Sequence, residues 1–353
     1  MPTTGSLIAF FRLMRPLNLA IIVLTMVAMR EGIIGGYLDL HTRLLQSAAV
    51  EVDGSVFAAV PGNVFEHAFP ALQFWLLVLS TVLIAAGGNI INDYFDTRID
   101  RINRPGGVIV GRTVKRRVAM AGHLVISTIG VLLGLWVAWR SGNWRWGLIP
   151  IFAVTTLWFY STTLKRAFLI GNGVVAVLSA LVPLTVGLYE IPALAQAYPA
   201  GMTATTTDGR VMVADFDWNT PWFAILIFAF FAFLTTLIRE LQKDMADITG
   251  DKADGRRTIP IVLGQRWAKR ITLLYIGITL PCLLAVRMTY LHDRFSYWYV
   301  GIGVLGPLLL SAGFTYNAFT RRDHTMADHL TKATMAMAIG YAFLMGHTVW
   351  QLQ

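Results

Sequence analysis

Cysteine and charged residues are both scarce in this chain. Cys282 is its single cysteine, which excludes a disulfide framework and a cysteine-based metal site. Charged residues make up only 14% of the sequence, whereas hydrophobic residues make up 56%. So little charge cannot cover the surface of a soluble protein of 353 residues. The composition therefore indicates an integral membrane protein.

Apolar runs long enough to cross a bilayer recur along the chain. Nine are predicted, and the first is interpreted as a retained span because it lacks a small-residue cleavage site. The predicted spans are residues 7–28, 71–91, 118–139, 146–163, 168–188, 222–238, 271–290, 297–314 and 331–350. Two long connections, at about 35–69 and 190–221, are predicted to be outer loops without a chemical role. The sequence thus predicts a single all-α, polytopic membrane domain over residues 1–353.

The basic residues are distributed unevenly between the predicted connections. Most of the 29 lysines and arginines fall on the side that includes the N-terminus, which predicts that this side is cytoplasmic and that the C-terminus lies outside. The net charge of +9 does not indicate nucleic-acid binding, because no zinc-finger, helix-turn-helix or RNA-binding signature accompanies it. Membrane lipid headgroups and substrate phosphates are the expected partners of these cations.

One acidic pattern, Asp-x-x-Asp-x-x-x-Asp, occurs twice, each time at the inner end of an apolar run. Positions i, i+3 and i+7 of an α-helix lie within about 60° of one another, so each copy is predicted to point three carboxylates at one place. Six of the 20 acidic residues belong to the two copies: Asp93, Asp96 and Asp100 in the first, and Asp244, Asp247 and Asp251 in the second. Carboxylates gathered in so apolar a protein need a counter-charge, for which divalent metal carrying phosphate is the expected candidate.

The two halves of the chain look like weak repeats around these motifs. Each motif is followed by a basic loop that closes with a proline, RINRP at Arg101–Pro105 and GRRTIP at Gly255–Pro260. A basic helix start then follows in both halves. Internal symmetry of this kind is common in membrane bundles whose functional site lies between the halves. We therefore expect the two motifs to face each other.

Two facing acidic patches could hold two Mg²⁺ ions and clamp a diphosphate between them. Mg²⁺ binds through one or two carboxylates plus substrate phosphates, and it would neutralise the diphosphate as a leaving group. The allylic carbocation left behind would need shielding from water by apolar and aromatic side chains. The candidates on the second and sixth predicted spans are Phe74, Trp75, Phe228, Phe230, Phe231 and Phe233.

Taken together, these motifs resemble those of the UbiA superfamily of intramembrane prenyltransferases. The resemblance rests on NDYFDTRID with the following RINRP, on KDMADITGD before GRRTIP, and on YSTTLKRAFLIGN at Tyr160–Asn172, and it covers nearly the whole chain. It implies nine transmembrane helices around a central cavity, with a cytoplasmic cap formed by loops at about 97–117 and 244–266. It also implies Mg²⁺-dependent transfer of a prenyl group from a polyprenyl diphosphate donor to a lipophilic or aromatic acceptor.

The resemblance also implies roles for individual residues. The metal ligands would be Asn92, Asp96, Asp100, Asp247 and Asp251. The remaining acids, Asp93 and Asp244, are interpreted as further ligands, water-mediated partners or helpers in deprotonating the acceptor. The diphosphate oxygens would be held by Lys165, Tyr160, Arg104, Arg112 and Lys243, with Arg239 as a further candidate. Asn89 and Asn172 would orient a ligand or join helices by hydrogen bonds.

The sequence leaves alternatives for the acceptor and for the function. DYFDTRIDRINRP resembles most closely the branch that acts on geranylgeranylglyceryl phosphate, but RPGGVIVGRTVKRR replaces the usual RPIPSG-type continuation. A 4-hydroxybenzoate-like ring is therefore a second candidate acceptor. The alternative function is a secondary transporter with acidic ion-coupling sites, although a transporter would place isolated acids near the middle of the bilayer.

Overall fold

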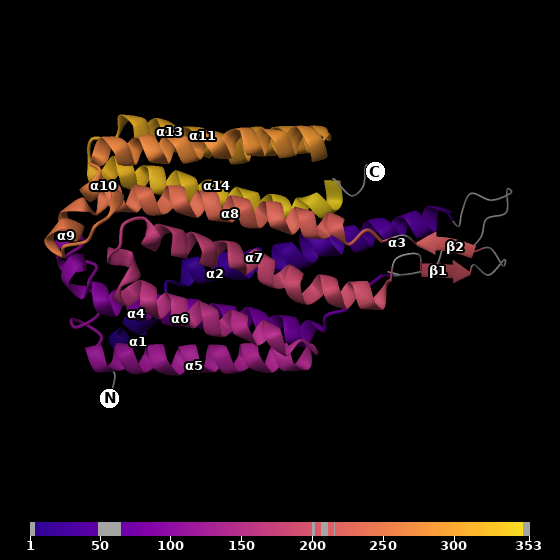
Figure 1. Ribbon diagram of the computed structural model, residues 1–353, viewed down its shortest axis with the longest axis horizontal. Coiled ribbons are helices and arrows are strands. Elements are labelled where there is room, and N and C mark those ends of the chain that lie inside the picture. The colour runs from indigo at the N-terminus through magenta and orange to yellow at the C-terminus, as the bar shows by residue number, and fades with distance from the viewer. Residues whose placement is uncertain (1–3, 49–64, 200–201, 206–210, 215, 349–353) are drawn as a thin grey trace.

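The structure is a computed structural model that describes residues 4–48, 65–199, 202–205, 211–214 and 216–348. Its long helices run side by side along one axis (Figure 1). At one end, which we call the hairpin end, β1 (Met202–Thr205) pairs antiparallel with β2 (Val211–Ala214). The other end carries the short helices α9 (Ile248–Ala253) and α10 (Ile259–Val262), and we call it the motif end.

Apart from this hairpin, the regular structure of the described residues is helical. The remaining helices are α1 (Thr4–Leu13), α2 (Pro16–Val27), η1 (Ala28–Gly35), α3 (Gly36–Ala48), α4 (Ala71–Asn103), α5 (Arg116–Arg140), η2 (Trp144–Gly147), α6 (Leu148–Thr162), η3 (Leu164–Arg166), α7 (Ile170–Ala197), α8 (Asn219–Ala246), α11 (Gln265–Tyr290), α12 (Arg294–Trp298), η4 (Tyr299–Leu305), α13 (Gly306–Asn317) and α14 (Arg321–Thr348). Among the described residues, 7 helical segments are long and apolar enough to cross a membrane. They begin at Pro16, Ala71, Arg116, Ile170, Asn219, Gln265 and Arg294. The chain is therefore an integral, multi-pass membrane protein.

The first predicted span is present, but its predicted bounds, 7–28, are wrong because the helix is interrupted at Arg15. Arg15 has a left-handed backbone conformation (φ 57°), and Pro16 begins a new helix at its first position. Proline fits the first turn of a helix, and the residue before it disfavours the helical conformation. The first candidate span consequently runs over Pro16–Arg43 and includes the π-helix η1, while α1 is a separate short helix.

The predicted outer loops are shorter than expected. Helix α3 extends into the first predicted loop, at 35–69, and residues 49–64 of that loop lie outside the described residues. Helix α7 extends to Ala197 within the second predicted loop, at 190–221, where the two strands also form.

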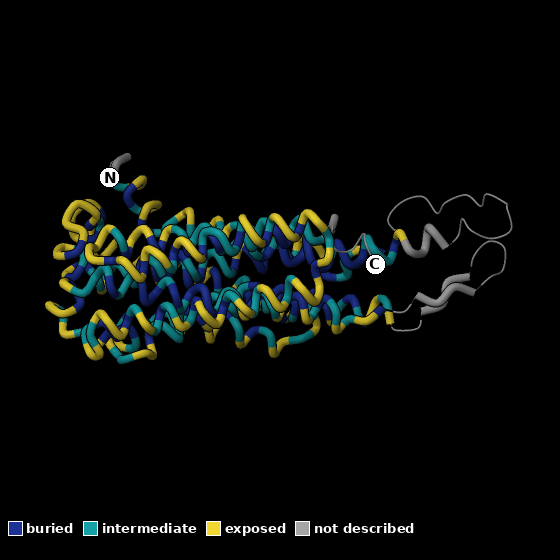
Figure 2. Tube along the Cα trace, turned by 90° about the horizontal axis from the view of Figure 1, so that it is seen from above, coloured by how far each residue is buried: buried dark blue, intermediate teal, exposed yellow. Residues whose placement is uncertain are grey.

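The helices form two groups with α2 and α7 between them (Figure 1). Helices α4, α5 and α6 belong to one group, and α8, α11, α13 and α14 to the other. Exposed residues cover the outside of the bundle, and buried residues lie along its interior (Figure 2). Small residues let α4 and α5 approach closely: a Cβ on Gly130 would lie 3.1 Å from the Ser80 carbonyl oxygen, and Ser80 donates a 2.6 Å hydrogen bond to Gly130.

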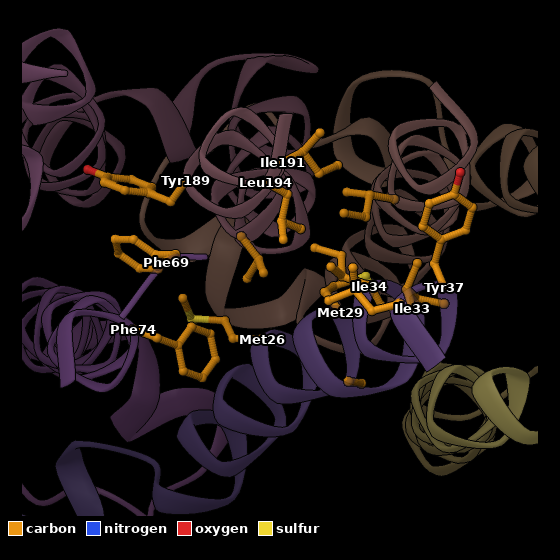
Figure 3. Packing of buried hydrophobic residues seen from close by; sticks show 14 of the residues in the cluster. Met26, Met29, Ile33, Ile34, Tyr37, Phe69, Phe74, Tyr189, Ile191 and Leu194 are labelled. Carbon is orange, nitrogen blue, oxygen red and sulfur yellow. The ribbon is translucent and has the colours of Figure 1, made fainter. Parts of the chain in front are cut away.

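The largest cluster of buried hydrophobic residues joins α2 and η1 to α4 and α7 (Figure 3). Met26, Met29, Ile33, Phe74 and Leu194 in this cluster are almost completely buried. Close packing of these side chains holds the helices together in the part of the bundle that lies away from the acidic motifs. The polar residues of the motif end are therefore supported by a dry core.

Charged residues at the edge of this core are paired with one another. Arg30 stacks on the Phe74 ring, 4.5 Å from its centroid, and forms a 3.1 Å ion pair with the buried Glu190. His67 lies 3.3 Å from Glu190 and 3.4 Å from Glu31. Burial opposes the charged imidazolium, but the hydrogen bonds to Glu190 and Glu31 outweigh burial and raise the pKa of His67 to about 9.

Candidate active site

The first acidic motif lies on the last turns of α4, which continues without a break to Asn103. The helical spacing alone predicts that its three acids point at one place, but Asp93 and Asp96 have different partners. Asp93 forms a 2.6 Å ion pair with Arg15, at the break between α1 and α2. Asp96 instead lies 2.6 Å from Lys165. The motif therefore has two sides, one toward the N-terminal helices and one toward the turn after α6.

Lys165 is the basic residue that the structure places most directly against the first motif. It lies on the short turn η3 after α6, and its ammonium donates to Asp96 and, at 3.3 Å, to the Asn92 side-chain oxygen. Burial lowers the pKa of Lys165, although the neighbouring Asp96 carboxylate raises it. The structure therefore brings Lys165, predicted as a diphosphate ligand, to Asn92 and Asp96, predicted as metal ligands. Asp100, one turn further along α4, is half-buried.

The second motif is not one continuous helix, which corrects the prediction that its three acids share a helical face. Helix α8 carries Asp244 and ends at Ala246, and Asp247 occupies the cap position between α8 and α9. Asp247 pairs with Arg104 at 3.2 Å and with Arg321 at 2.9 Å. Asp251 lies on α9 and is buried. The change of direction at Asp247 turns Asp251 back toward α4.

Arg256 is the point where the two motifs meet. Its guanidinium pairs with Asp96 of the first motif and, at 3.3 Å, with Asp251 of the second. Asp254 lies 3.8 Å from the same side chain. Burial raises the pKa of Asp251 to about 6, although Arg256 lowers it. Two carboxylates from different halves of the chain are thus gathered around one cation, as the paired motifs predict.

Asn103 joins the end of α4 to the second motif through its side chain. Its amide oxygen accepts a 2.9 Å hydrogen bond from the Gly250 backbone N–H, and its amide nitrogen donates at 3.2 Å to the Asp247 carbonyl. A Cβ on Gly250 would lie only 2.4 Å from the Asn103 amide nitrogen. A side chain at position 250 would therefore displace the Asn103 amide, whose hydrogen bonds join the second motif to the end of α4.

The other predicted site residues are divided between this site and its surroundings. Asn172 donates a 2.9 Å hydrogen bond to Asp244, and Asn89 donates at 2.9 Å to the Met14 carbonyl, so both join helices. Lys243 pairs with Glu240, and Arg239 pairs with Asp328 at 2.9 Å. Arg112 is exposed in the loop before α5, and no ion pair joins it to a motif acid in the described part of the chain.

Of two cavities among the described residues, the smaller one reaches Asn92, next to the first acidic motif. This cavity, of about 320 Å³, is lined by Asn92 and Tyr160 and continues along α4 past Ile84 and Leu157. The larger cavity, of about 470 Å³, is mostly apolar and is lined by Phe228 and Phe231. Of the other predicted aromatic residues, Phe74 is buried in the core, and Trp75 and Phe230 are exposed on the outside of the bundle.

Sequence reasoning missed the cations that come from distant parts of the chain. Arg15, Arg256 and Arg321 each pair with a motif acid, but the sequence places them only among the many basic residues of the inner side. The GRRTIP loop was the one local signal for Arg256. Its neighbour Arg257 is exposed, so the loop sequence alone could not distinguish the two.

The donor atoms of the site fit Mg²⁺. All five predicted ligands offer side-chain oxygen, which Mg²⁺ prefers, and none offers sulfur or imidazole. In the part of the chain that the structure describes, no three His, Cys, Asp or Glu residues are close enough to hold an ion alone. Mg²⁺ does not need such a cage, because it takes one or two carboxylates and completes its shell with phosphate and water. Asp96 and Asp251, around one cation, offer that arrangement.

Comparison with known proteins agrees with the motifs and the helical architecture. The chain is 31% identical over 316 residues to the digeranylgeranylglyceryl phosphate synthase of Thermococcus kodakarensis. The aligned region covers 88% of this chain and 95% of that protein. It is 32% identical over 276 residues to the synthase of the same name from Thermococcus gammatolerans, with 76% and 84% covered. The fold is similar, with a TM-score of 0.51 and 14% identity, to a UbiA homologue from Archaeoglobus fulgidus bound to GPP and Mg²⁺, over 95% of this chain and 99% of that one. The model of the UbiA prenyltransferase family matches residues 55–340, and the chain therefore belongs to that family.

Proposed function

We propose that this prenyltransferase transfers a prenyl group from a polyprenyl diphosphate to the hydroxyl of a prenylglyceryl phosphate. The observation that carries the proposal is the meeting of Asp96 and Asp251 at Arg256, beside Lys165. The names of the two Thermococcus relatives support the choice of acceptor. The secondary-transporter alternative finds no support, because the matching family consists of prenyltransferases.

The two motifs would hold Mg²⁺ together with the donor diphosphate. Asn92, Asp96 and Asp100 would serve one ion, and Asp247 and Asp251 a second. Mg²⁺ bound there would neutralise the charge that develops on the diphosphate as it leaves. The complex of the Archaeoglobus fulgidus homologue with GPP and Mg²⁺ supports this use of the metal.

Basic and polar side chains would hold the diphosphate from the other side. Lys165 and Arg256 already lie at the carboxylates, and binding of the metal and diphosphate would let these cations turn to phosphate oxygens. Tyr160 lines the cavity beside Asn92, and Arg104 reaches the second motif through Asp247. These four side chains would bind the leaving group, whereas the apolar part of the cavity would hold the donor tail.

The transfer itself breaks the bond between the prenyl C1 and the diphosphate oxygen and forms a C1–oxygen bond to the acceptor. The diphosphate leaves with the bonding electron pair, and the acceptor hydroxyl loses its proton. We assign acceptance of that proton to Asp244, whose carboxylate is held by the neutral amide of Asn172. Asp93, held by the Arg15 guanidinium, would position the end of α4.

The motif end would face the cytoplasm, as the distribution of basic residues predicts. Helices α6 and α14 would cross the membrane together with the 7 segments that are long and apolar enough to do so, giving nine spans in two related halves. The loop before α5 and the segment from α9 to α10 would then cap the site from the cytoplasmic side. The end of α14 would lie outside.

Product analysis with a panel of acceptors tests the function. Purified protein in detergent would receive geranylgeranyl diphosphate, Mg²⁺ and either a prenylglyceryl phosphate or 4-hydroxybenzoate, followed by mass spectrometry. We expect a diprenylglyceryl phosphate as the product. Transfer to 4-hydroxybenzoate alone would show that the acceptor is the aromatic ring, and transfer to neither would refute the proposal.

A further inference from the structure

A second group of cations lines the smaller cavity and pairs with carboxylates outside the acidic motifs. It consists of Arg239 and Lys243 on α8 and Lys332 on α14. The side chains of Lys243 and Lys332 are 33% and 34% exposed, so neither ammonium is sealed in the protein interior. These cations line the same cavity as Asn92 and Tyr160. Their carboxylate partners differ from those of Lys165 and Arg256, which pair with motif acids. The cavity therefore has two polar regions.

Two carboxylates that belong to neither motif hold this second group in place. Asp328 accepts a 2.9 Å hydrogen bond from Arg239 Nε and lies 3.4 Å from Lys332 Nζ. Glu240 pairs with Lys243. Three cations face two carboxylates, and the contact with Asp328 engages only the Nε of Arg239. The group therefore keeps ammonium and guanidinium donors for an additional anion.

The larger, apolar cavity ends beside these cations. On α8, Thr235 lines the larger cavity and Arg239 follows it by about one helical turn. On α14, Met335 lines both cavities and Lys332 precedes it by about one turn. A molecule whose tail lies in the larger cavity would therefore place its headgroup at the cations.

The wall of the larger cavity suits a hydrocarbon chain. Apart from Thr220, which donates to the Asp217 carboxylate, its threonine hydroxyls are bonded to carbonyls of their own helices: Thr25 donates to Ile21 at 2.8 Å and Thr235 to Phe231 at 2.6 Å. Such hydroxyls present methyl groups rather than free donors to the cavity. Burial of an apolar tail there is favourable in proportion to its area.

We propose that the two features together form the acceptor site. The phosphate of the prenylglyceryl phosphate binds Arg239, Lys243 and Lys332, and its tail lies in the 470 Å³ cavity. The donor keeps the other polar region, at Asn92 and Tyr160, and the part of the smaller cavity along α4. This inference rests on the proposed function and assigns the acceptor to a different group of residues from the donor.

The arrangement brings the two substrates together at their reactive ends. The two cavities share wall residues on α2, α7 and α14, among them Ile22, Val182 and Met335. The two tails would lie on either side of this shared wall. Both headgroups would be near the motif end, since Asn92 and Arg239 line the same cavity. Such placement would reduce the entropy cost of bringing the reacting atoms together.

Steady-state kinetics with two matched acceptors test the proposal. One acceptor is geranylgeranylglyceryl phosphate, and the other is the same lipid without its phosphate. With wild-type protein, loss of the phosphate should raise the acceptor KM about tenfold or more, because charge-assisted contacts are lost. Lys332→Met should raise KM for the phosphate acceptor by a similar factor, with little change in KM for the alcohol or for the donor diphosphate. Lys332→Arg, which keeps the charge, should restore most of the affinity.

Arg322→Met is the matched control, because Arg322 is an exposed cation of the same helix that lines neither described cavity. It should leave both acceptor KM values unchanged. Equal KM values of wild-type protein for the two acceptors would overturn the proposal, as would a wild-type KM for the phosphate acceptor in both Lys332→Met and Arg239→Met. Either result leaves the proposed function standing, since wild-type turnover continues. Absence of transfer to either acceptor by wild-type protein would instead refute the proposed function.

Discussion

Replacing Gly250 with alanine should disturb the relation between the two acidic motifs without removing a charged group. The added Cβ would lie 2.4 Å from the Asn103 amide nitrogen and 2.6 Å from its Cγ, much closer than van der Waals contact allows. The Asn103 side chain would have to move. It would then lose its hydrogen bonds with Gly250 N, at 2.9 Å, and with the Asp247 carbonyl, at 3.2 Å.

The expected size of the effect follows from these two hydrogen bonds. Each is worth about 0.5–1.5 kcal/mol, so the junction should lose about 1–3 kcal/mol of stability. Alanine favours a helix over glycine by about 1 kcal/mol, so helix propensity opposes this loss rather than causing it. Asp251 follows directly after Gly250 and would shift relative to Asp96. A displacement of about 1 Å can lower turnover about 100-fold, and we expect kcat to fall by at least about tenfold.

A double-mutant cycle with Asn103→Ala gives the decisive comparison. Initial rates and thermal unfolding in detergent would be measured for each single variant and for the double variant. In the Asn103→Ala background, where the clashing amide is gone, Gly250→Ala should have almost no further effect. The control is Gly277→Ala on α11, where a Cβ would meet no atom within 4 Å. Additive effects of the two substitutions would refute a role for the Asn103–Gly250 contact.

Three further predictions concern the basic half of the site, the hairpin end and the membrane orientation. Arg256→Met should raise the KM for the donor diphosphate about tenfold or more through loss of a charge-assisted contact. Arg257→Met, at the exposed neighbouring position, should leave this KM unchanged. An unchanged donor KM in both variants would exclude Arg256 from the site. The pKa of His67 is raised from 6.5 to about 9 in the folded protein. Its contribution of about 3 kcal/mol to the free energy of unfolding should therefore be complete below pH 6.5 and lost as the pH rises through about 9. Thermal unfolding from pH 6 to 10 checks this, and a pH profile that His67→Gln does not flatten would contradict it. In a Cys282→Ser background, cysteine at the exposed positions of Gly106 and Glu66 should be labelled from the cytoplasm and from outside, respectively; the reverse pattern would show that the basic residues indicate the wrong side.

The sequence predicts the parts of the site that depend on local spacing. The first motif lies on one unbroken helix, as its spacing predicts, and Lys165, a predicted diphosphate ligand, lies beside Asn92 and Asp96. Those residues lie at fixed positions relative to the ends of α4 and α6. Their sequence motifs are therefore sufficient to predict where they lie. The second motif differs because its helix ends at Ala246, a break that identical acidic spacing does not reveal.

The parts that the sequence does not predict depend on contacts between distant segments. Arg15 pairs with Asp93 across the helix break at Pro16, and Arg256 rather than Arg257 turns toward the acids. Proline at position 16 does signal a break, since the residue before proline avoids the helical conformation, but the apolar residues on both sides suggest one continuous span. Tertiary packing therefore decides which of many similar cations reach the site.

The most direct test of the account measures Mg²⁺-dependent binding of the donor. Purified wild-type protein, Asp96→Ala and Asp251→Ala would be titrated with geranylgeranyl diphosphate in Mg²⁺ and, separately, in EDTA, with thermal unfolding as the check on folding. We predict that wild-type protein binds the diphosphate tightly only with Mg²⁺ and that each folded alanine variant loses this Mg²⁺-dependent binding. Binding that is equally tight in EDTA, or wild-type affinity in both variants, would contradict the claim that acids from the two motifs hold the metal and diphosphate together.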